Sequence, residues 1–320
     1  MIKEALLLDL YGILSFNMYN SYLKIITIKM KKITRVLYFG FLCFAIFIST
    51  SCSSDEKTDP NDEQFDDGDD GTNTVSKPLL NSVNTSNWIL MFEDNFDKFE
   101  PTKWTKNNSA RSRAARPGIG INQWFWKPEN VSYRDGNLIL KSKKVANDVL
   151  HCGGVFTNNL FEFKYGYIEA KIDIAETLFG THTALWLQGD NMGNIDGTGN
   201  DGAEIDVFES AWIGDFTKSV VHIDGYGASH KANTRQYDTP GIHSGYHIYG
   251  LLWNEDMLEV YYDGKFKTRY QGIWVPHVEE FLWISTGASF GGAANSNFSS
   301  RSIGDYTEAK VDYIRVWRMD

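Results

Sequence analysis

The chain has 320 residues, of which 42% are hydrophobic and 14% aromatic, enough for a sizeable core in one large domain or two ordinary ones. Its formal net charge is −10 and no basic patch dominates, so the composition argues against nucleic-acid binding. The ten tryptophans and sixteen tyrosines exceed what packing alone usually needs, and such rings often cover the apolar faces of sugars.

Residues 1–51 are predicted to form a leader. Met30 is a better start than Met1, because a basic segment and an apolar run from Val36 to Ile48 follow it. That run is too short to span a bilayer as a helix but suits a signal peptide over residues 30–51. Whether residues 1–29 are translated is left open by the sequence.

The leader ends in Ser49-Thr50-Ser51-Cys52, which resembles a bacterial lipoprotein processing site with serine where leucine is usual. The resemblance implies cleavage before Cys52 and lipidation of its thiol. An ordinary secretory signal with a chance cysteine is the alternative. Residues 52–78 follow as an acidic tract with little apolar surface, so we expect a flexible tether.

An acidic run directly after the cysteine resembles the surface-export signals of Bacteroidetes lipoproteins. It implies an exported protein anchored in the outer membrane and facing outward, which touches the membrane only through its lipid. Cys43 and Cys52 lie in or beside the leader, which leaves Cys152 alone in the main body. No disulfide framework is therefore available there, and Cys152 is predicted to be a small buried residue.

Residues 79–320 are predicted to form one all-β domain. Short alternating runs recur between Gly, Asn and Asp clusters, and turn signals such as Asp135-Gly136-Asn137 and Asp263-Gly264-Lys265 separate several of them. So many strands favour a single sandwich or jelly roll. The predicted strands are Trp88–Phe92, Asn137–Ser142, Gly166–Ile174, Thr183–Gln188, Glu204–Phe208, Ser219–Ile223, His247–Trp253, Leu258–Tyr262, Phe281–Ser285 and Ala309–Trp317.

One of these runs carries three acids, Glu204, Asp206 and Glu209. Side chains alternate along a strand, so Glu204 and Asp206 share a face, and a β-bulge before Glu209 would return the third acid to it. Two inward-leaning glutamates there could approach the carboxyl separation of roughly 5–5.5 Å typical of retaining glycosidases. A merely acidic solvated face is the alternative, although like charges on one face repel.

The motifs around this stretch resemble glycoside hydrolase family 16, in the order of that family and over essentially all of residues 88–320. They are Phe92–Asp97 with Lys103-Trp104, Asp135–Leu140, Tyr165–Lys171, Ala184–Gln188, Glu204–Glu209, Tyr246–Trp253 and Val311–Trp317. The resemblance implies a concanavalin-like β-jelly roll of two curved antiparallel sheets with a sugar cleft on the concave face.

The family resemblance also implies endo-acting hydrolysis of a polysaccharide with retention of configuration, by a monomer that needs no cofactor for catalysis. Carried onto this chain, Glu204 is the nucleophile and Glu209 the general acid/base. Asp206 lies between them and helps to position Glu204 and to set the coupled pKa values.

Further residues are candidates for contact with substrate. Trp186 precedes the acidic strand, Trp124 and Trp126 alternate in a Gly-rich loop, and Trp212 closely follows the acids. His222 matches a histidine that often faces the family's active site. Core packing is the alternative for Trp186, and a structural role is the alternative for His222.

A basic loop precedes Trp124 and contains Lys106, Arg111, Arg113 and Arg116. It is either a solvated loop or, through Arg116 and its neighbours, a site for sulfate or carboxylate groups on an algal galactan. The resemblance also implies a stabilising calcium ion near Glu93, Gly136 and Asp312, although Asp312 could instead only end a strand.

The acid spacing resembles that of laminarinases but is shared by agarases, porphyranases and κ-carrageenases. We therefore expect laminarin-type β-1,3-glucan as the substrate, with the red-algal galactans agarose, porphyran and carrageenan as alternatives. Transglycosylation would use the same residues. A non-catalytic glycan-binding surface lipoprotein is the alternative of a different class, although such a module need not keep both Glu204 and Glu209.

Overall fold

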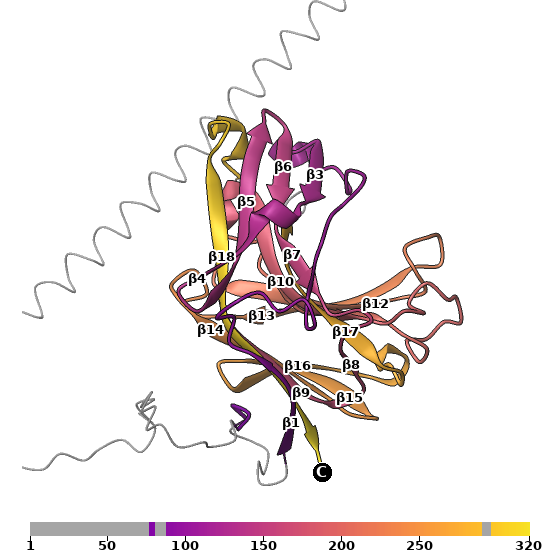
Figure 1. Cartoon of the computed structure of the whole chain (residues 1–320). Coiled ribbons are helices and arrows are strands. Elements are labelled where there is room, and N and C mark those ends of the chain that lie inside the picture. The colour runs from indigo at the N-terminus through magenta and orange to yellow at the C-terminus, as the bar shows by residue number, and fades with distance from the viewer. Residues whose placement is uncertain (1–76, 81–87, 290–295) are drawn as a thin grey trace, which may run out of the picture. The chain divides into compact units, whose positions relative to one another are not determined.

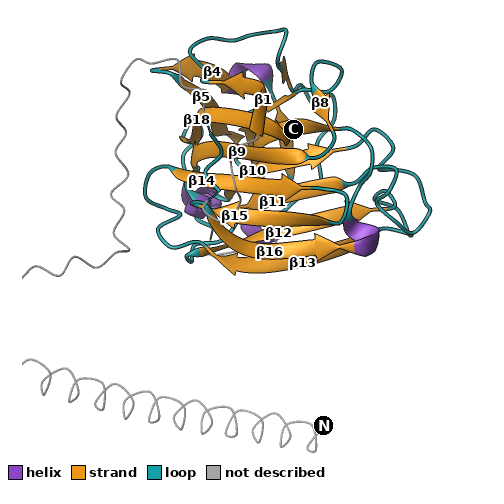
Figure 2. Cartoon of the chain, turned by 90° about the horizontal axis from the view of Figure 1, so that it is seen from below, coloured by secondary structure: helices purple, strands orange, loops and turns teal. Residues whose placement is uncertain are grey.

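The computed structural model describes residues 77–80, 88–289 and 296–320, which belong to one compact unit, Thr72–Asp320 (Figure 1). The predicted leader, the lipidated Cys52 and most of the tether lie outside the described residues. Within the described part, regular structure consists of β-strands and short 3-10 turns (Figure 2). No helix there is long and apolar enough to cross a membrane.

The first sheet has ten strands within the described residues, in the order β16-β15-β14-β9-β18-β5-β6-β3, with β1 beside β18 and β4 beside β5. Its strands are β1 (Trp88–Asp94), β3 (Gln123–Trp126), β4 (Val131–Arg134), β5 (Asn137–Ala146), β6 (Val149–Cys152), β9 (Gly166–Asp173), β14 (His247–Trp253), β15 (Met257–Tyr262), β16 (Lys265–Gln271) and β18 (Tyr306–Met319).

The second sheet has eight strands in the same part of the chain, in the order β13-β12-β11-β10-β17-β7-β2, with β8 beside β17. Its strands are β2 (Thr105–Lys106), β7 (Gly154–Phe156), β8 (Glu162–Phe163), β10 (Thr181–Gln188), β11 (Glu204–Glu209), β12 (Phe216–Ile223), β13 (Lys231–Asp238) and β17 (Glu280–Ala288). The 3-10 turns are η2 (Pro117–Ile119), η3 (Pro128–Asn130), η4 (Thr177–Phe179), η5 (Gly272–Trp274) and η6 (Phe298–Ser300).

The main hydrophobic core lies between the two sheets, because the apolar side chains of both contribute to one buried cluster. Phe208 of the second sheet stacks on Tyr249 of the first, with ring centroids 3.7 Å apart. Burial of such large apolar surfaces is the main favourable contribution to folding. Among the described strands, all pairings except the parallel pair β3–β6 are antiparallel, which confirms the predicted all-β sandwich of two antiparallel sheets.

Every strand predicted from the sequence is present, and most extend by one to four residues at an end. The two turn signals are confirmed in their conformation: Asp135 and Gly136 have φ of 53° and 68°, and Asp263 and Gly264 have 48° and 69°. Two successive positive φ angles are what a tight two-residue hairpin requires. The pattern missed the edge strands β13 and β16, whose side chains are mostly exposed and lack apolar alternation.

Residues 123–126 were predicted as part of a loop and instead form strand β3. This strand pairs in parallel with β6, where Trp124 lies opposite Leu150. A four-residue strand that pairs with a segment more than twenty residues away leaves little local signal. Cys152, at the end of β6, is fully buried as predicted.

Candidate active site

The three acids lie on β11, and the predicted bulge is present between Asp206 and Glu209. On β10, Trp186 is opposite Asp206 and Leu185 is opposite Phe208, so Val207 is the extra residue. Val207 and Phe208 are both fully buried in the core, which turns Glu209 back to the face of Asp206. The local cause of the site is therefore two consecutive apolar side chains that both pack inward.

The acids open onto a cavity of about 710 Å³, lined among others by Glu204, Asp206 and Glu209. A second cavity of about 600 Å³ shares Glu204 and Tyr226 with the first, so the two adjoin along the sheet. Six residues predicted to contact substrate also line the first cavity: Trp124, Trp126, Trp186, Trp212, His222 and Arg116.

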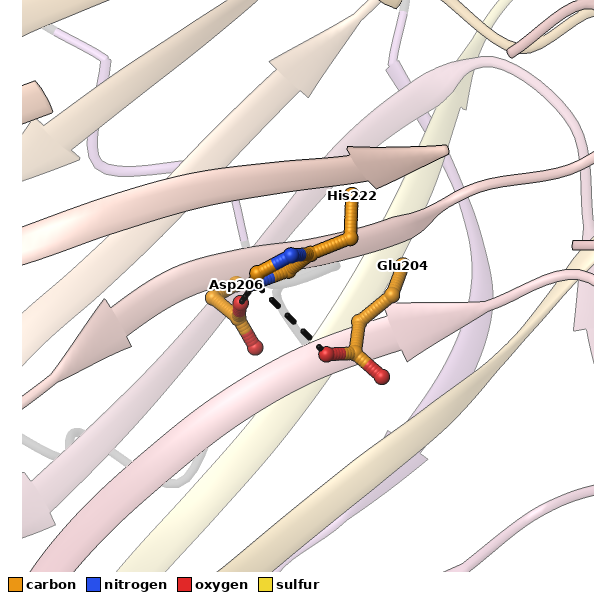
Figure 3. A group of neighbouring side chains, drawn as sticks. All are labelled: Glu204, Asp206 and His222. Atoms are coloured by element: carbon orange, nitrogen blue, oxygen red, sulfur yellow. Dashed lines mark ion pairs between the residues drawn. The ribbon is translucent and has the colours of Figure 1, made fainter. Parts of the chain in front are cut away.

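His222 lies on β12 directly opposite Glu204. Its Nε2 atom is 3.4 Å from Asp206 Oδ2 and 3.9 Å from Glu204 Oε1 (Figure 3). Within the described residues, Glu204, Asp206 and His222 form the only group of three or more His, Cys, Asp or Glu side chains whose potential metal-ligand atoms all lie within 4.8 Å of one another. A third acid, Glu209, lies on the same strand and lines the same cavity as Glu204 and Asp206. We therefore interpret the group as acid–base residues of an active site and not as a metal site.

Tyr226 follows β12 and donates a hydrogen bond from its hydroxyl to Glu204 Oε2. Burial and the nearby Glu204 charge raise the pKa of the Tyr226 hydroxyl, so the hydroxyl remains a donor. A donor to a carboxylate favours its ionised form. Glu204 is thus contacted from two sides, by the hydroxyl of Tyr226 at one oxygen and by the imidazole of His222 near the other.

The three carboxyl groups experience different environments. Burial raises the pKa of Glu204, but His222 and Tyr226 act against this rise. Burial raises the pKa of Glu209 well above its usual range, and the charges of Asp206 and Glu204 raise it further. Glu204 is therefore the carboxyl favoured to ionise, and Glu209 the one favoured to stay protonated. Divergent pKa values in one acid pair are the usual mark of a nucleophile or base beside an acid.

Asp206 is the most buried of the three acids, with 4% of its surface exposed. Burial raises its pKa well above the usual range, and the charge of Glu204 adds to the rise. Its Oδ2 atom accepts no hydrogen bond among the described residues, while Ser219 donates to its backbone carbonyl at 2.7 Å. Ser219 thereby fixes the backbone of the bulged strand.

Aromatic rings form the wall of the second cavity. Trp186 stacks on Trp283 with centroids 4.5 Å apart and planes inclined by 6°, and Trp126 stacks on Trp283 at 5.4 Å. Trp283 is only half-buried, and its indole N–H has no protein partner within the described residues. Stacked, partly exposed aromatic rings of this kind suit the apolar face of a sugar ring.

Trp124 and Trp126 are each only 4% exposed, so they line the first cavity as packed rings and not as an exposed platform. Their indole nitrogens donate to backbone carbonyls of Ala114 and Thr286. Trp212 is half-buried at the cavity, and the ammonium group of Lys218 lies 4.3 Å from its ring. The predicted tryptophans are thus gathered at one site in different degrees of exposure.

The basic loop divides into two parts. Arg111 and Arg113 line the second cavity, Arg113 and Arg116 line the first, and the Arg113 guanidinium lies 4.1 Å from the Trp126 ring. Lys106 instead donates to the carbonyl of Val131 and lies over Phe99, away from both cavities. The three arginines therefore lie in the cavities that also contain the acids, whereas Lys106 contacts the backbone and a ring outside them.

The residues predicted to hold calcium already contact cationic side chains. Glu93 Oε1 accepts from Arg315 Nε at 2.7 Å, and its backbone carbonyl accepts from Lys103 Nζ at 2.8 Å. Asp312 Oδ2 pairs with Lys171 Nζ at 3.0 Å, and Gly136 occupies the β4–β5 turn. Side-chain cations at two of the three positions would compete with a metal ion, so this arrangement does not fit a calcium cradle; calcium binding stays an untested prediction.

The sequence reasoning missed Trp283, Tyr226, Lys218 and His230. Trp283 lies on the predicted run Phe281–Ser285, where its alternation with Phe281 could have indicated a cleft-facing ring. Tyr226 and His230 belong to the connection between β12 and β13. The signal available for them was their closeness in sequence to His222.

The comparisons with known proteins agree with this geometry. The family model described as glycosyl hydrolases family 16 matches residues 121–278. A glucan endo-1,3-beta-glucosidase A1 from Niallia circulans is 24% identical, over 81% of this chain and 42% of its own. A kappa-carrageenase from Pseudoalteromonas carrageenovora is 25% identical, over 72% of this chain and 64% of its own. The chain thus spans about half the length of these relatives.

Solved structures share the fold. A family 16 enzyme of a mixed-linkage glucan locus of Bacteroides ovatus, in complex with a product, superposes with a TM-score of 0.60 at 20% identity, covering 70% of this chain and 99% of that one. A laminarinase from Flavobacterium sp. UMI-01 gives a TM-score of 0.56 at 20% identity, covering 72% of this chain and 100% of that one. At such identities the likeness is one of architecture.

Proposed function

We propose that the chain is a member of glycosyl hydrolase family 16, whose model matches residues 121–278, and that it is an endo-acting, retaining glycoside hydrolase that cuts internal β-linkages of a polysaccharide. The observation that carries the proposal is the bulge in β11, which sets Glu204, Asp206 and Glu209 along one cavity. Open, adjoining cavities suit a long chain better than a chain end.

In the proposed reaction, the ionised Glu204 attacks the anomeric carbon while Glu209 gives its proton to the departing glycosidic oxygen. A covalent glycosyl-enzyme results, and the deprotonated Glu209 then takes a proton from the water that releases the sugar. The raised pKa of Glu209 keeps its proton available for the first step. Tyr226 and His222 favour the negative charge of Glu204. Asp206 lies between the two glutamates and couples their titrations.

Laminarin-type β-1,3-glucan is the proposed substrate. The support is the name of the Niallia circulans relative and the acid spacing, together with the aromatic wall of Trp126, Trp186 and Trp283. The chemistry of the acids does not depend on which sugar is bound. Transfer to a sugar hydroxyl in place of water would use the same residues.

A red-algal galactan is the second candidate, and the arginines favour it. Arg111, Arg113 and Arg116 line the cavities, and Lys218 lies beside Glu209 in the first. With Glu209 protonated, these four cations outnumber the remaining acids Glu204 and Asp206. Guanidinium groups suit sulfate and carboxylate groups, and a relative is named a kappa-carrageenase.

We also propose that the protein is exported and held at the outer membrane by a lipid on Cys52, on the basis of the sequence motif described above. Labelling of the protein by a radioactive fatty acid in cells tests this, with Cys52→Ser as the matched control. Label that persists in Cys52→Ser would contradict the anchor.

Release of reducing ends from laminarin, lichenan, agarose, porphyran and carrageenans tests the function. We expect turnover on one of them by the purified protein, with products of intermediate length appearing first. Glu204→Gln should be inactive on the same polysaccharide. Binding to one of the glycans without any hydrolysis would instead support the non-catalytic binding module.

A further inference from the structure

His222 has a different partner at each ring nitrogen. Its Nε2 atom faces Asp206 and Glu204, whereas its Nδ1 atom lies 2.8 Å from Nε2 of His230. The two imidazole rings have centroids 5.0 Å apart and planes inclined by 14°. His230 directly precedes β13, so the β12–β13 connection places a second histidine behind the first.

A contact between two ring nitrogens needs one proton between them. A neutral imidazole donates through one nitrogen and accepts through the other. Burial lowers the pKa of His222 and of His230, and the neighbouring His222 lowers that of His230 further, so both rings are favoured as neutral. Two arrangements follow: either His230 donates to His222, or His222 donates to His230.

The choice between these two arrangements decides whether Asp206 faces an N–H group or a lone pair on His222 Nε2. If His230 donates, the proton of His222 sits on Nε2, the ring nitrogen that lies 3.4 Å from Asp206 Oδ2. If His222 donates, the lone pair of Nε2 faces two acidic side chains. Asp206 Oδ2 is buried and otherwise lacks a hydrogen-bond donor among the described residues, and buried polar atoms rarely stay without one.

The other charged or titratable groups around the pair do not replace this donor. The Tyr226 hydroxyl donates its hydrogen bond to Glu204 Oε2 and not to Asp206. Arg113 interacts electrostatically with Glu204 and lies over Trp126, and Lys218 lies over Trp212. Lys231, next to His230, pairs with Asp224 at 2.8 Å. His222 Nε2 is therefore the group placed to serve Asp206.

We propose that His230 is a positioning residue: it donates its Nε2–H to His222 Nδ1 and thereby fixes the proton of His222 on Nε2, directed at Asp206 and Glu204. The hydrogen bond at one nitrogen of a histidine commonly sets the tautomer at the other. The effect of His230 on turnover rests on the proposed function, whereas the tautomer of His222 does not.

The tautomer is measured by nitrogen-15 NMR of the imidazoles of the whole protein, with His222→Gln used to assign the His222 signals. We expect the proton of His222 on Nε2 in the wild type. His230→Gln keeps an amide N–H donor near the position of Nε2 and should keep this tautomer. His230→Leu removes the donor at similar size, so the Nε2 tautomer should lose its dominance.

Kinetics on the hydrolysed polysaccharide give the second readout. His230→Leu should lower kcat by up to about tenfold, the effect expected from the loss of one ordering hydrogen bond, with KM and melting temperature little changed. His230→Gln should recover most of the loss. His243, an exposed histidine hydrogen-bonded to the carbonyl of Gly214, offers the matched control, and His243→Leu should leave kcat unchanged.

A His222 proton found on Nδ1 in the wild type would overturn the proposal. So would a His230→Leu protein with the wild-type tautomer and kcat. If no polysaccharide is hydrolysed, the proposed function fails while the NMR experiment still decides the direction of the hydrogen bond.

Discussion

Two buried acids on opposite sheets are treated differently by their surroundings. Glu259, on β15 of the ten-stranded sheet, is 6% exposed, and Asp206, on β11 of the eight-stranded sheet, is 4% exposed. Glu259 accepts from Arg269 Nε at 2.8 Å and from the Tyr261 hydroxyl at 2.7 Å. Asp206 Oδ2 accepts no hydrogen bond among the described residues.

Glu169 extends the contrast on the ten-stranded sheet. It accepts from the backbone N–H of Leu79 at 2.9 Å and from the Tyr313 hydroxyl at 3.2 Å. The comparison teaches that burial alone does not identify a reactive acid. Burial also raises the pKa of Glu169, although donors contact both of its oxygens, so a raised pKa alone does not mark a reactive acid either. What sets the acids of β11 apart is that three of them lie close together on one cavity with few hydrogen-bond donors.

The largest expected effect is a loss of kcat when either glutamate of β11 is replaced. Glu209→Gln removes the proton donor, so kcat on a polysaccharide should fall about 10²–10⁴-fold, and Glu204→Gln, which lacks the nucleophile, should lose at least as much. Reducing-end assays measure this, and circular dichroism checks the fold. Near-normal turnover by either variant would contradict the assignment of the acids.

A smaller loss is expected from Asp206→Asn, with a change in the pH profile. The charge of Asp206 is one cause of the raised pKa of Glu209. Its removal should lower that pKa, so the alkaline limb of kcat/KM moves to lower pH while kcat falls about 10–100-fold. An alkaline limb that stays in place would show that Asp206 does not act on Glu209.

Tyr226→Phe tests the hydrogen bond that the Tyr226 hydroxyl donates to Glu204, the proposed nucleophile. Because the Tyr226 hydroxyl lowers the pKa of Glu204, its loss should raise that pKa and move the acidic limb of kcat/KM to higher pH. A hydrogen bond to a charged group contributes about 1.5–3 kcal/mol, so we expect a fall in kcat/KM of roughly tenfold or more. An unchanged acidic limb would mean that the hydroxyl does not serve Glu204 during turnover.

Melting temperatures sharpen the comparison, because the two sheets should respond with opposite signs. The folded pKa of Asp206 lies above its unfolded value, so its ionisation costs stability as pH rises through the interval between them. Asp206→Asn should therefore melt higher than the wild type at neutral pH. Glu259→Gln weakens the ion pair with Arg269 and should melt lower, by about 2–4 °C per kcal/mol lost, with kcat unchanged.

Calorimetry of both variants at pH 7 checks this pair of signs. The Glu259–Arg269 pair is partly exposed on the arginine side, so its loss should be modest. A lower melting temperature for Asp206→Asn would mean that Asp206 stabilises the fold as Glu259 does, and the contrast between the sheets would disappear.

The sequence predicted the parts of the site that depend on local order. The alternation from Glu204 to Phe208 and the extra residue before Glu209 are enough to infer a bulged strand with its acids on one face. The position of Trp186 beside that strand follows from the neighbouring run, and the turn residues locate the hairpins.

Other parts depend on contacts between distant segments. Trp283 reaches Trp186 because β17 pairs with β10, about a hundred residues away in sequence. Lys106 shares a basic loop with Arg113 but turns to Phe99, since β2 pairs with β7 and directs it outward from the cavities. Charge and composition alone do not distinguish these two destinations.

The central claim is that Glu204 attacks the sugar and that Glu209 serves first as acid and then as base, which requires net retention. The most direct measurement is proton NMR of the anomeric signals during the first minutes of hydrolysis of whichever polysaccharide is cleaved. We predict that the new reducing ends appear as the β-anomer, with the α-anomer growing in only by mutarotation. Initial release of the α-anomer would contradict the account, because it would require direct attack by water and not by Glu204.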